Sequence, residues 1–149
     1  MSKEVLKNLI KERYKNREKF SIEVDVSLTH LTRILNNREF DCNFKTILKI
    51  AKVLNINILY FILEDEKYLK SKYKDLDYFC IISKNVKKLR EKRNFSQKMV
   101  AELSQISLRT YSSIEGNKMD NLKVSTIIKL NRIFKISLKN FLFKESCFI

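Results

Sequence analysis

The sequence repeats itself, and this repeat constrains the fold more than any other feature. Residues 6–63 align with residues 86–143 at a constant offset of 80 residues and without a gap. The shared positions are spread along the whole stretch: Leu9 and Leu89, Arg13 and Arg93, Ser27 and Ser107, Ile34 and Ile114, Asn37 and Asn117, Ile47 and Ile127, Lys49 and Lys129, Ile56 and Ile136, Phe61 and Phe141. Because chance does not keep such a register over so long a stretch, the repeat predicts two copies of one domain, at 1–63 and 83–149, with a linker at 64–82.

The hydrophobic residues of each copy recur with the spacing of an amphipathic helix, as Leu6, Leu9 and Ile10 do. The pattern predicts five helices in the first copy, at 3–14, through Phe20 and Ser21, from Ser27, at 44–54, and from Asn57 into Phe61. In the second copy it predicts helices at 82–93, 97–103, 107–115, 124–134 and 137–143. With one glycine and no proline, little of the chain signals hairpin turns, so the predicted fold class is all-α.

Two of the predicted helices in the second copy, 97–103 and 107–115, are separated by only a few residues. Ser96 and Ser107 are suited to cap their N-termini, and Gly116 with Asn117 can supply the positive φ that ends the second helix. The small Ala101 lets the two helices approach closely. Two short helices around a tight turn predict a helix-turn-helix, in which the second helix enters the DNA major groove.

The charge of the chain agrees with a polyanionic partner. The formal net charge is +14, from 31 Lys and Arg against 17 Asp and Glu. Residues 1–63 hold 12 bases and 7 acids, whereas residues 83–149 hold 15 bases and 5 acids, so the second copy is expected to bind DNA more strongly. A solvated basic surface would give the same totals, so charge alone does not decide between the two interpretations.

The second copy resembles the Xre-like family of phage-repressor helix-turn-helix domains. The resemblance rests on residues 86–90, 95–97, 100–103, 106–107 and 114–117, and residues 46–54 of the first copy resemble the fourth helix of that family. The family implies two tandem five-helix repressor-like domains. The first copy departs further from it, because Asn16-Arg17 replaces Ser-Gln and Val24 replaces Ser104. The family's turn glycine is Asp25 in one copy and Gln105 in the other.

The resemblance also implies roles for single residues of the second copy. Gln97 would contact a DNA phosphate, and Asn117 and Lys118 would meet the backbone from the loop. The predicted recognition helix would present Ser107, Leu108, Arg109, Ser112 and Ser113. Of these, Arg109 is best able to read a base, because a guanidinium donates two hydrogen bonds to guanine O6 and N7. Leu108 either contacts a thymine methyl or is partly packed.

In the first copy the matching DNA-facing set is Arg17, Leu28, Thr29, Arg33, Asn37 and Arg38. The family further implies a structural ion pair between Arg93 and Glu115, which fixes the recognition helix against the first helix. Arg13 keeps the arginine in the first copy, but Leu35 stands at the partner position, so the pair cannot form there.

The segment 64–82 mixes five acids and four bases with aromatic residues, unlike a flexible tether. We expect it to be helical, to extend the first copy's last helix and to fix the orientation of the domains. The tail, 141–143 and 147–149, is more apolar than a solvated terminus needs. It either covers the linker or forms a contact in a homodimer.

Other classes of protein find little support in the sequence. The three cysteines are far apart and match neither a disulfide framework nor a zinc site, so no metal or cofactor is expected. No run approaches ~18 apolar residues, and no signal region opens the chain, so we expect no membrane association and a cytoplasmic, nucleoid-associated protein. The chain shows no Ser/His/Asp set, phosphate-binding glycine loop or catalytic carboxylate pair, so we do not expect an enzyme.

Two functions from different classes remain at this point. The favoured one is a sequence-specific regulator of transcription that binds double-stranded DNA, most simply a repressor, with recognition helices at 27–35 and 107–115. The abundance of Lys, Ile and Asn suggests an AT-rich bacterial or phage genome. The alternative is a protein-interaction module, of an antirepressor or antitoxin-like kind, in which the first copy binds a protein partner.

Overall fold

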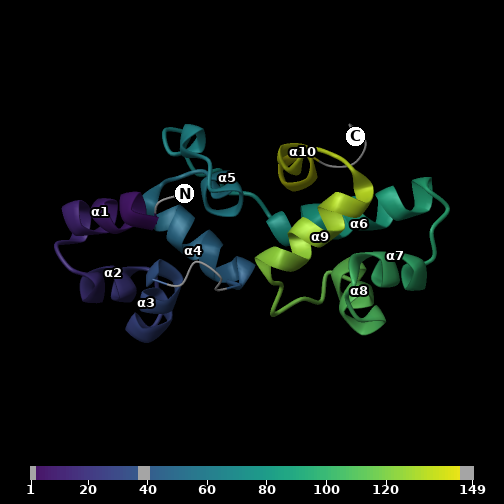
Figure 1. Ribbon diagram of the computed structural model, residues 1–149, viewed down its shortest axis with the longest axis horizontal. Helices are drawn as coiled ribbons and strands as arrows, with labels where there is room; N and C mark the ends of the chain where they lie inside the picture. The colour runs from purple at the N-terminus through teal and green to yellow at the C-terminus, as the bar shows by residue number, and fades with distance from the viewer. Residues whose placement is uncertain (1–2, 37–40, 145–149) are drawn as a thin grey trace. The chain divides into compact units, whose positions relative to one another are not determined.

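The computed structural model describes residues 3–36 and 41–144 of the chain. The chain divides into two compact units, which we name unit 1 (residues 1–74) and unit 2 (residues 75–149). The described residues form ten α-helices and one short 3-10 helix, with no β-strand among them (Figure 1). The predicted all-α fold class is confirmed.

Unit 1 contains five α-helices followed by the 3-10 helix. Their bounds are α1 (Lys3–Tyr14), α2 (Arg17–Glu23), α3 (Leu28–Asn36), α4 (Phe44–Leu54), α5 (Ile58–Leu63) and η1 (Glu66–Tyr68). The core of the unit is apolar and includes the fully buried side chains of Phe20, Phe44 and Ile50. The helices α1, α2 and α3 contact one another, and α4 contacts α5.

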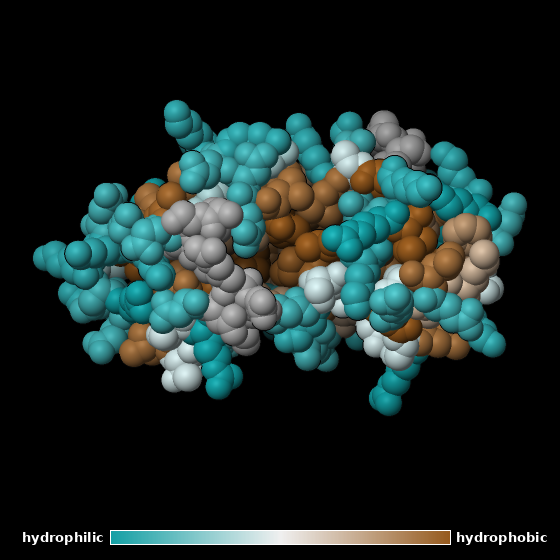
Figure 2. Space-filling model, viewed as in Figure 1, coloured by the Kyte–Doolittle hydropathy of each residue, from teal (hydrophilic) through white to brown (hydrophobic). Residues whose placement is uncertain are grey.

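Unit 2 contains α6 (Tyr78–Lys92), α7 (Gln97–Ser104), α8 (Leu108–Glu115), α9 (Val124–Phe134) and α10 (Leu138–Phe143). Its core includes the fully buried Val86, Ile127 and Phe134. The long helix α6 contacts α8, α9 and α10, and α7 contacts α8 and α9. Figure 2 shows hydrophilic side chains projecting from the surface of each unit, with hydrophobic atoms visible among them.

Most of the predicted helix ends follow their local signals. The side chains of Ser96, Ser107 and Asn57 accept hydrogen bonds from backbone N–H groups in the first turns of α7, α8 and α5. The end of α8 differs from the prediction in one residue. Gly116 has a φ of −78° and remains right-handed, whereas Asn117 alone takes the left-handed conformation, with a φ of 53°. Asparagine tolerates that conformation, so the helix ends without a left-handed glycine.

Helices α2 to α5 each begin 80 residues before α7 to α10. The turn between α2 and α3 uses Asp25 in the left-handed region, and the turn between α7 and α8 uses Gln105 in the same region. Asn55 and Lys135 adopt it at the ends of α4 and α9. The local backbone conformation therefore repeats with the period of the sequence.

The segment 64–82 is not a continuous helical linker, so that prediction is wrong. The helix α5 ends at Leu63 because Glu64 takes a left-handed conformation, with a φ of 53°. After the short η1, no helix forms until Tyr78, where Asp77 caps the first turn of α6 through its side chain. The last part of the predicted linker thus belongs to the first helix of unit 2. Over residues 3–36 and 41–144, no helix has both the length and the apolar character needed to cross a bilayer.

Candidate nucleic-acid interface

The helices α7 and α8 pack side by side across a short turn in unit 2 (Figure 1). Ala101 and Ser104 are buried on α7, and the Ser104 hydroxyl donates to the Val100 carbonyl at 2.6 Å. Gln105 closes α7 by donating its backbone N–H to the Glu102 carbonyl. Ile106 then leads directly to Ser107, the cap of α8. The predicted helix pair and its tight turn are therefore present.

The helix α8 has a buried face and an exposed face. Tyr111 and Ile114 are fully buried, whereas Leu108 keeps 47% of its surface exposed. The exposed face and the following loop carry Ser107, Arg109, Ser112, Asn117 and Lys118, and Ser113 is half-buried. The residues of α8 that are predicted to contact bases thus lie on the side of the helix that does not pack into the core of unit 2.

A network of polar side chains holds the end of α8 to α6 and α7. The Glu115 carboxylate accepts hydrogen bonds from Arg90 Nε at 2.5 Å, Gln97 Nε2 at 2.7 Å and the Tyr111 hydroxyl at 2.8 Å. The Ser83 hydroxyl donates to the Glu115 carbonyl at 2.7 Å. The Glu115 side chain is 5% exposed, so Arg90, Gln97 and Tyr111 replace the water that its carboxylate has lost, while Ser83 binds the backbone of the same residue.

The predicted pair between Arg93 and Glu115 is therefore wrong, because Arg90 binds that carboxylate through two nitrogens. Arg93 instead donates to the backbone carbonyl of Phe134, at the C-terminal end of α9. In unit 1, Arg13 donates to the Leu54 carbonyl at the end of α4, at 2.7 Å. In both units this arginine thus donates to a backbone carbonyl in the last turn of a helix. Carbonyls there lack partners within the helix, and positive charge is favoured.

Unit 1 replaces the network with apolar side chains. At the offset of 80 residues, Arg90, Tyr111 and Glu115 correspond to Ile10, Leu31 and Leu35. All three apolar side chains are fully or almost fully buried. The sequence holds a signal for Arg90. Arg93 is still an arginine in unit 1, as Arg13, whereas Arg90 and Glu115 are both replaced there by apolar residues, Ile10 and Leu35.

The polar network around Glu115 and the apolar packing that replaces it are expected to differ in how their stability depends on acid pH. Burial raises the pKa of Glu115, but hydrogen bonds from Arg90, Gln97 and Tyr111 outweigh that effect and lower the pKa below its ordinary value of 4.5. A carboxyl group with a lowered pKa in the folded state stabilises the fold above its unfolded pKa, and this contribution is lost as the pH falls through the folded pKa.

We therefore expect the urea midpoint of unit 2 to fall between pH 6 and pH 3 by more in the wild type than in a triple variant, Arg90→Ile, Tyr111→Leu and Glu115→Leu. The triple variant carries the unit 1 residues and lacks the Glu115 carboxylate. Hydrogen exchange of α8 at a series of urea concentrations measures the midpoint. An equal decrease in both proteins would show that Glu115 does not contribute to acid sensitivity.

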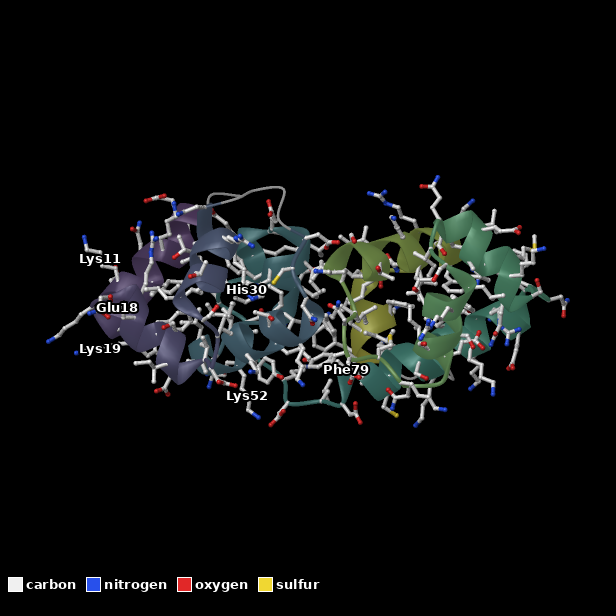
Figure 3. The ribbon with its side chains drawn as sticks, turned by 90° about the horizontal axis from the view of Figure 1, so that it is seen from below. Lys11, Glu18, Lys19, His30, Lys52 and Phe79 are labelled. Atoms are coloured by element: carbon white, nitrogen blue, oxygen red, sulfur yellow. The ribbon has the colours of Figure 1, made fainter. Side chains whose placement is uncertain are left out.

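The helix α3 of unit 1 also has an exposed face. Leu28 keeps 38% of its surface exposed, and Thr29 and Arg33 are exposed, whereas Leu31, Ile34 and Leu35 are buried. Arg17, the first residue of α2, is half-buried, and Lys19 points away from the body of the unit in Figure 3. The predicted contacts Asn37 and Arg38 lie outside the described residues. His30 is half-buried, with its Nε2 shielded from solvent.

The described arginines fall into two groups. Arg13, Arg90 and Arg93 donate to carbonyl or carboxylate oxygens within their own unit. Within the described part of the chain, four arginines make no hydrogen bond or ion pair through their side chains: Arg17, Arg33, Arg109 and Arg132. Three of these four stand at positions where the sequence predicts contact with DNA. A guanidinium carries five N–H donors, so these three have donors free for an external acceptor.

Little else in the described part of the chain resembles a functional centre. Neither Cys42 nor Cys80 is joined to another described cysteine by a disulfide. Among the residues that the structure describes, no group of histidine, cysteine and acidic side chains could hold a metal ion.

Comparison with known proteins supports the interpretation of unit 2. Residues 83–146 match the model of a family described as a helix-turn-helix domain. No curated protein and no solved structure matches the chain significantly. The matched residues run from Ser83 across α7 and α8 to the end of α10, and so include the whole polar network around Glu115. Residues 83–146 are therefore similar to helix-turn-helix domains over the part of unit 2 that holds α7 and α8.

Proposed function

We propose that the protein is a sequence-specific regulator of transcription that binds double-stranded DNA and acts as a repressor. In this proposal unit 1 is a second, divergent copy of the helix-turn-helix domain, and both copies are of the Xre-like type. The helices α8 and α3 enter the major groove and read base edges, while residues around them contact phosphates. The helix-turn-helix domain at 83–146 supports DNA as the partner.

The observation that carries this proposal is the placement of the unpartnered arginines. Arg109 lies in the first turn of α8, on the same exposed face as Leu108 and Ser112. Arg33 lies on the exposed face of α3, and Arg17 begins α2. The arginines needed for internal structure have internal acceptors, so the remaining ones gain most from an external anion. Arginine suits this role because its planar fork binds phosphate and guanine through paired hydrogen bonds.

The repeated structure supports the assignment of unit 1 as a second copy. The four helices after the first begin at one offset, and Arg13 and Arg93 bind carbonyl groups at equivalent helix ends. In unit 1 the exchange of a polar network for leucine and isoleucine keeps the third helix packed. A recognition helix held in place by apolar contacts can still present its outer face to DNA.

The proposal is tested by replacing Arg17, Arg33 and Arg109 together with alanine and measuring affinity for mixed-sequence duplex DNA. We expect the dissociation constant to rise by about tenfold or more, since each lost contact removes a charge-assisted hydrogen bond. Arg132→Ala, which removes an unpartnered arginine of α9, is the matched control and should bind as the wild type does. Equal affinity of all three proteins, or no affinity of the wild type for duplex DNA, would contradict the proposal.

The second candidate, a protein-interaction module, is favoured by one observation on unit 1. Ile22 on α2 is 79% exposed, whereas the corresponding residue of unit 2 is Glu102. A partner protein that docked on α2 would remove this apolar side chain from water. If unit 1 serves only this purpose, replacing Arg17 and Arg33 leaves DNA affinity unchanged, which separates the two candidates.

A further inference from the structure

Unit 2 contains a pocket outside its helix pair. The pocket has a volume of about 310 Å³ and is lined by Leu89, Lys92, Arg93 and Ile136. The first three of these residues lie at the C-terminal end of α6, and Ile136 lies between α9 and α10. None of the four belongs to α7 or α8, so the pocket is separate from the residues that are predicted to contact DNA. Its volume is at the lower end of the range for small-molecule sites.

The walls of the pocket combine apolar and cationic side chains. Leu89 is almost fully buried and Ile136 is half-buried, so both offer aliphatic surface. Lys92 is exposed and Arg93 is half-buried, so two positive charges lie beside that surface. Among the described residues that line the pocket, none is acidic. Such walls suit a ligand that has an apolar body and a negatively charged end.

Arg93 keeps both charge and hydrogen-bond donors available for a ligand. Its Nη1 donates to the Leu89 carbonyl at 3.4 Å, and its Nη2 donates to the Phe134 carbonyl. Both acceptors are neutral, and no carboxylate of the described residues lies within ion-pair distance, so the positive charge is not neutralised. The Nε–H group has no acceptor within the same residues. The two bonds also occupy carbonyl oxygens at helix ends, which would otherwise repel an anion.

The equivalent place in unit 1 differs in charge. At the offset of 80 residues, the four lining residues correspond, in chain order, to Leu9, Glu12, Arg13 and Ile56. The two aliphatic residues and the arginine are therefore shared, and only Lys92 is exchanged, for an acid. Two positive charges in unit 2 thus correspond to two opposite charges in unit 1, which do not attract an anion.

We propose that the pocket of unit 2 binds a small organic carboxylate with an aliphatic body. The carboxylate lies between Lys92 and Arg93, where charge-assisted hydrogen bonds hold it. The aliphatic body covers Leu89 and Ile136, and its removal from water distinguishes this ligand from an inorganic anion. The site requires no contact with DNA, so unit 2 binds the ligand whether or not α8 reads bases.

The test is a titration of the full chain with hexanoate, followed through the backbone amide signals of Leu89, Lys92 and Ile136 in NMR spectra. We expect these signals to shift and to saturate, whereas those of Leu9 and Ile56 do not shift. Hexanol has the same chain without the charge, and inorganic phosphate has charge without the chain. Each of the two should bind at least about fivefold more weakly than hexanoate.

The variant Lys92→Glu gives unit 2 the residue of unit 1 and should raise the dissociation constant of hexanoate by about fivefold, because an attraction becomes a repulsion. Lys87→Glu makes the same change of charge at an exposed position of α6 outside the pocket, and it should bind as the wild type does.

Equal affinity of the wild type for hexanoate and hexanol, or for hexanoate and phosphate, would overturn the inference. An unchanged dissociation constant in Lys92→Glu would overturn it too, as would an equal loss of affinity in Lys87→Glu, since the effect would then reflect total charge. Shifts that do not saturate, or that are equally large at Leu9 and Ile56, would show that no specific site exists. None of these outcomes bears on DNA binding, so the proposed function is tested separately.

Discussion

Replacing Glu115 with alanine is expected to lower the free energy of unfolding of unit 2 by about 3–5 kcal/mol. The carboxylate is the common acceptor for Arg90, Gln97 and Tyr111, and it is almost fully shielded from solvent. Its removal leaves the Arg90 guanidinium, which is 15% exposed, with only the exposed Glu91 carboxylate, at 3.7 Å, as an anion, and leaves the buried Tyr111 hydroxyl without the acceptor it has in the wild type. Urea denaturation of the full chain, followed by hydrogen exchange in α8, measures the loss.

The matched control for this prediction is the triple variant Arg90→Ile, Tyr111→Leu and Glu115→Leu. Replacing a buried ion pair by packed apolar residues is often neutral or stabilising, and unit 1 already uses this combination. We expect the triple variant to recover most of the stability that Glu115→Ala loses. A loss below about 1 kcal/mol in Glu115→Ala, the range of exposed ion pairs, would show that the network does not hold α8.

Replacing Arg109 with alanine is expected to reduce discrimination between the preferred base and its alternatives at one base pair by about 1–3 kcal/mol. Arg109 is exposed in the first turn of α8 and has no internal partner among the described residues. Its side chain can donate two hydrogen bonds to guanine, and their loss removes the distinction between that base and the others. Competition between the preferred duplex and single-mismatch duplexes measures the change.

The conservative variant Arg109→Lys distinguishes base recognition from charge. Lysine keeps the positive charge but lacks the planar fork of two donors. We expect Arg109→Lys to keep much of the affinity and to lose part of the discrimination. If wild type and Arg109→Ala discriminate equally at every position of the site, Arg109 does not read a base.

The helices could be predicted well because their signals are local. The helices α1, α4 and α9 have the bounds expected from the spacing of apolar residues. The hydroxyl oxygens of Ser96 and Ser107 accept hydrogen bonds from the N–H groups of Met99 and Thr110, each three residues further along the chain. Such contacts depend on few neighbours, so the sequence alone is sufficient to indicate them.

The partner of Glu115 has no local signal of this kind, and only the joint change to Ile10 and Leu35 in unit 1 points to Arg90. Arg90 lies in the last turn of α6, and Arg93 follows three residues later at the end of that helix, so spacing does not decide which of the two reaches α8. Which arginine reaches Glu115 depends on the end of α9, because Arg93 donates to the Phe134 carbonyl there. That carbonyl is a backbone group far along the chain, and no side-chain pattern marks it. The end of α5 at Leu63 could not be predicted, because the left-handed residue that follows it is Glu64 and not the glycine or asparagine that usually adopts this conformation.

Base recognition by both units is tested by selecting bound sequences from random duplex DNA, with the wild type and with the variants Arg109→Ala and Arg33→Ala. Neither side chain has an internal partner among the described residues, so both variants should fold as the wild type does. We expect two enriched half-sites, one altered by each substitution. A single half-site, unaffected by Arg33→Ala, would contradict base reading by unit 1. No enrichment of any sequence would contradict the account of the protein as a sequence-specific DNA-binding regulator.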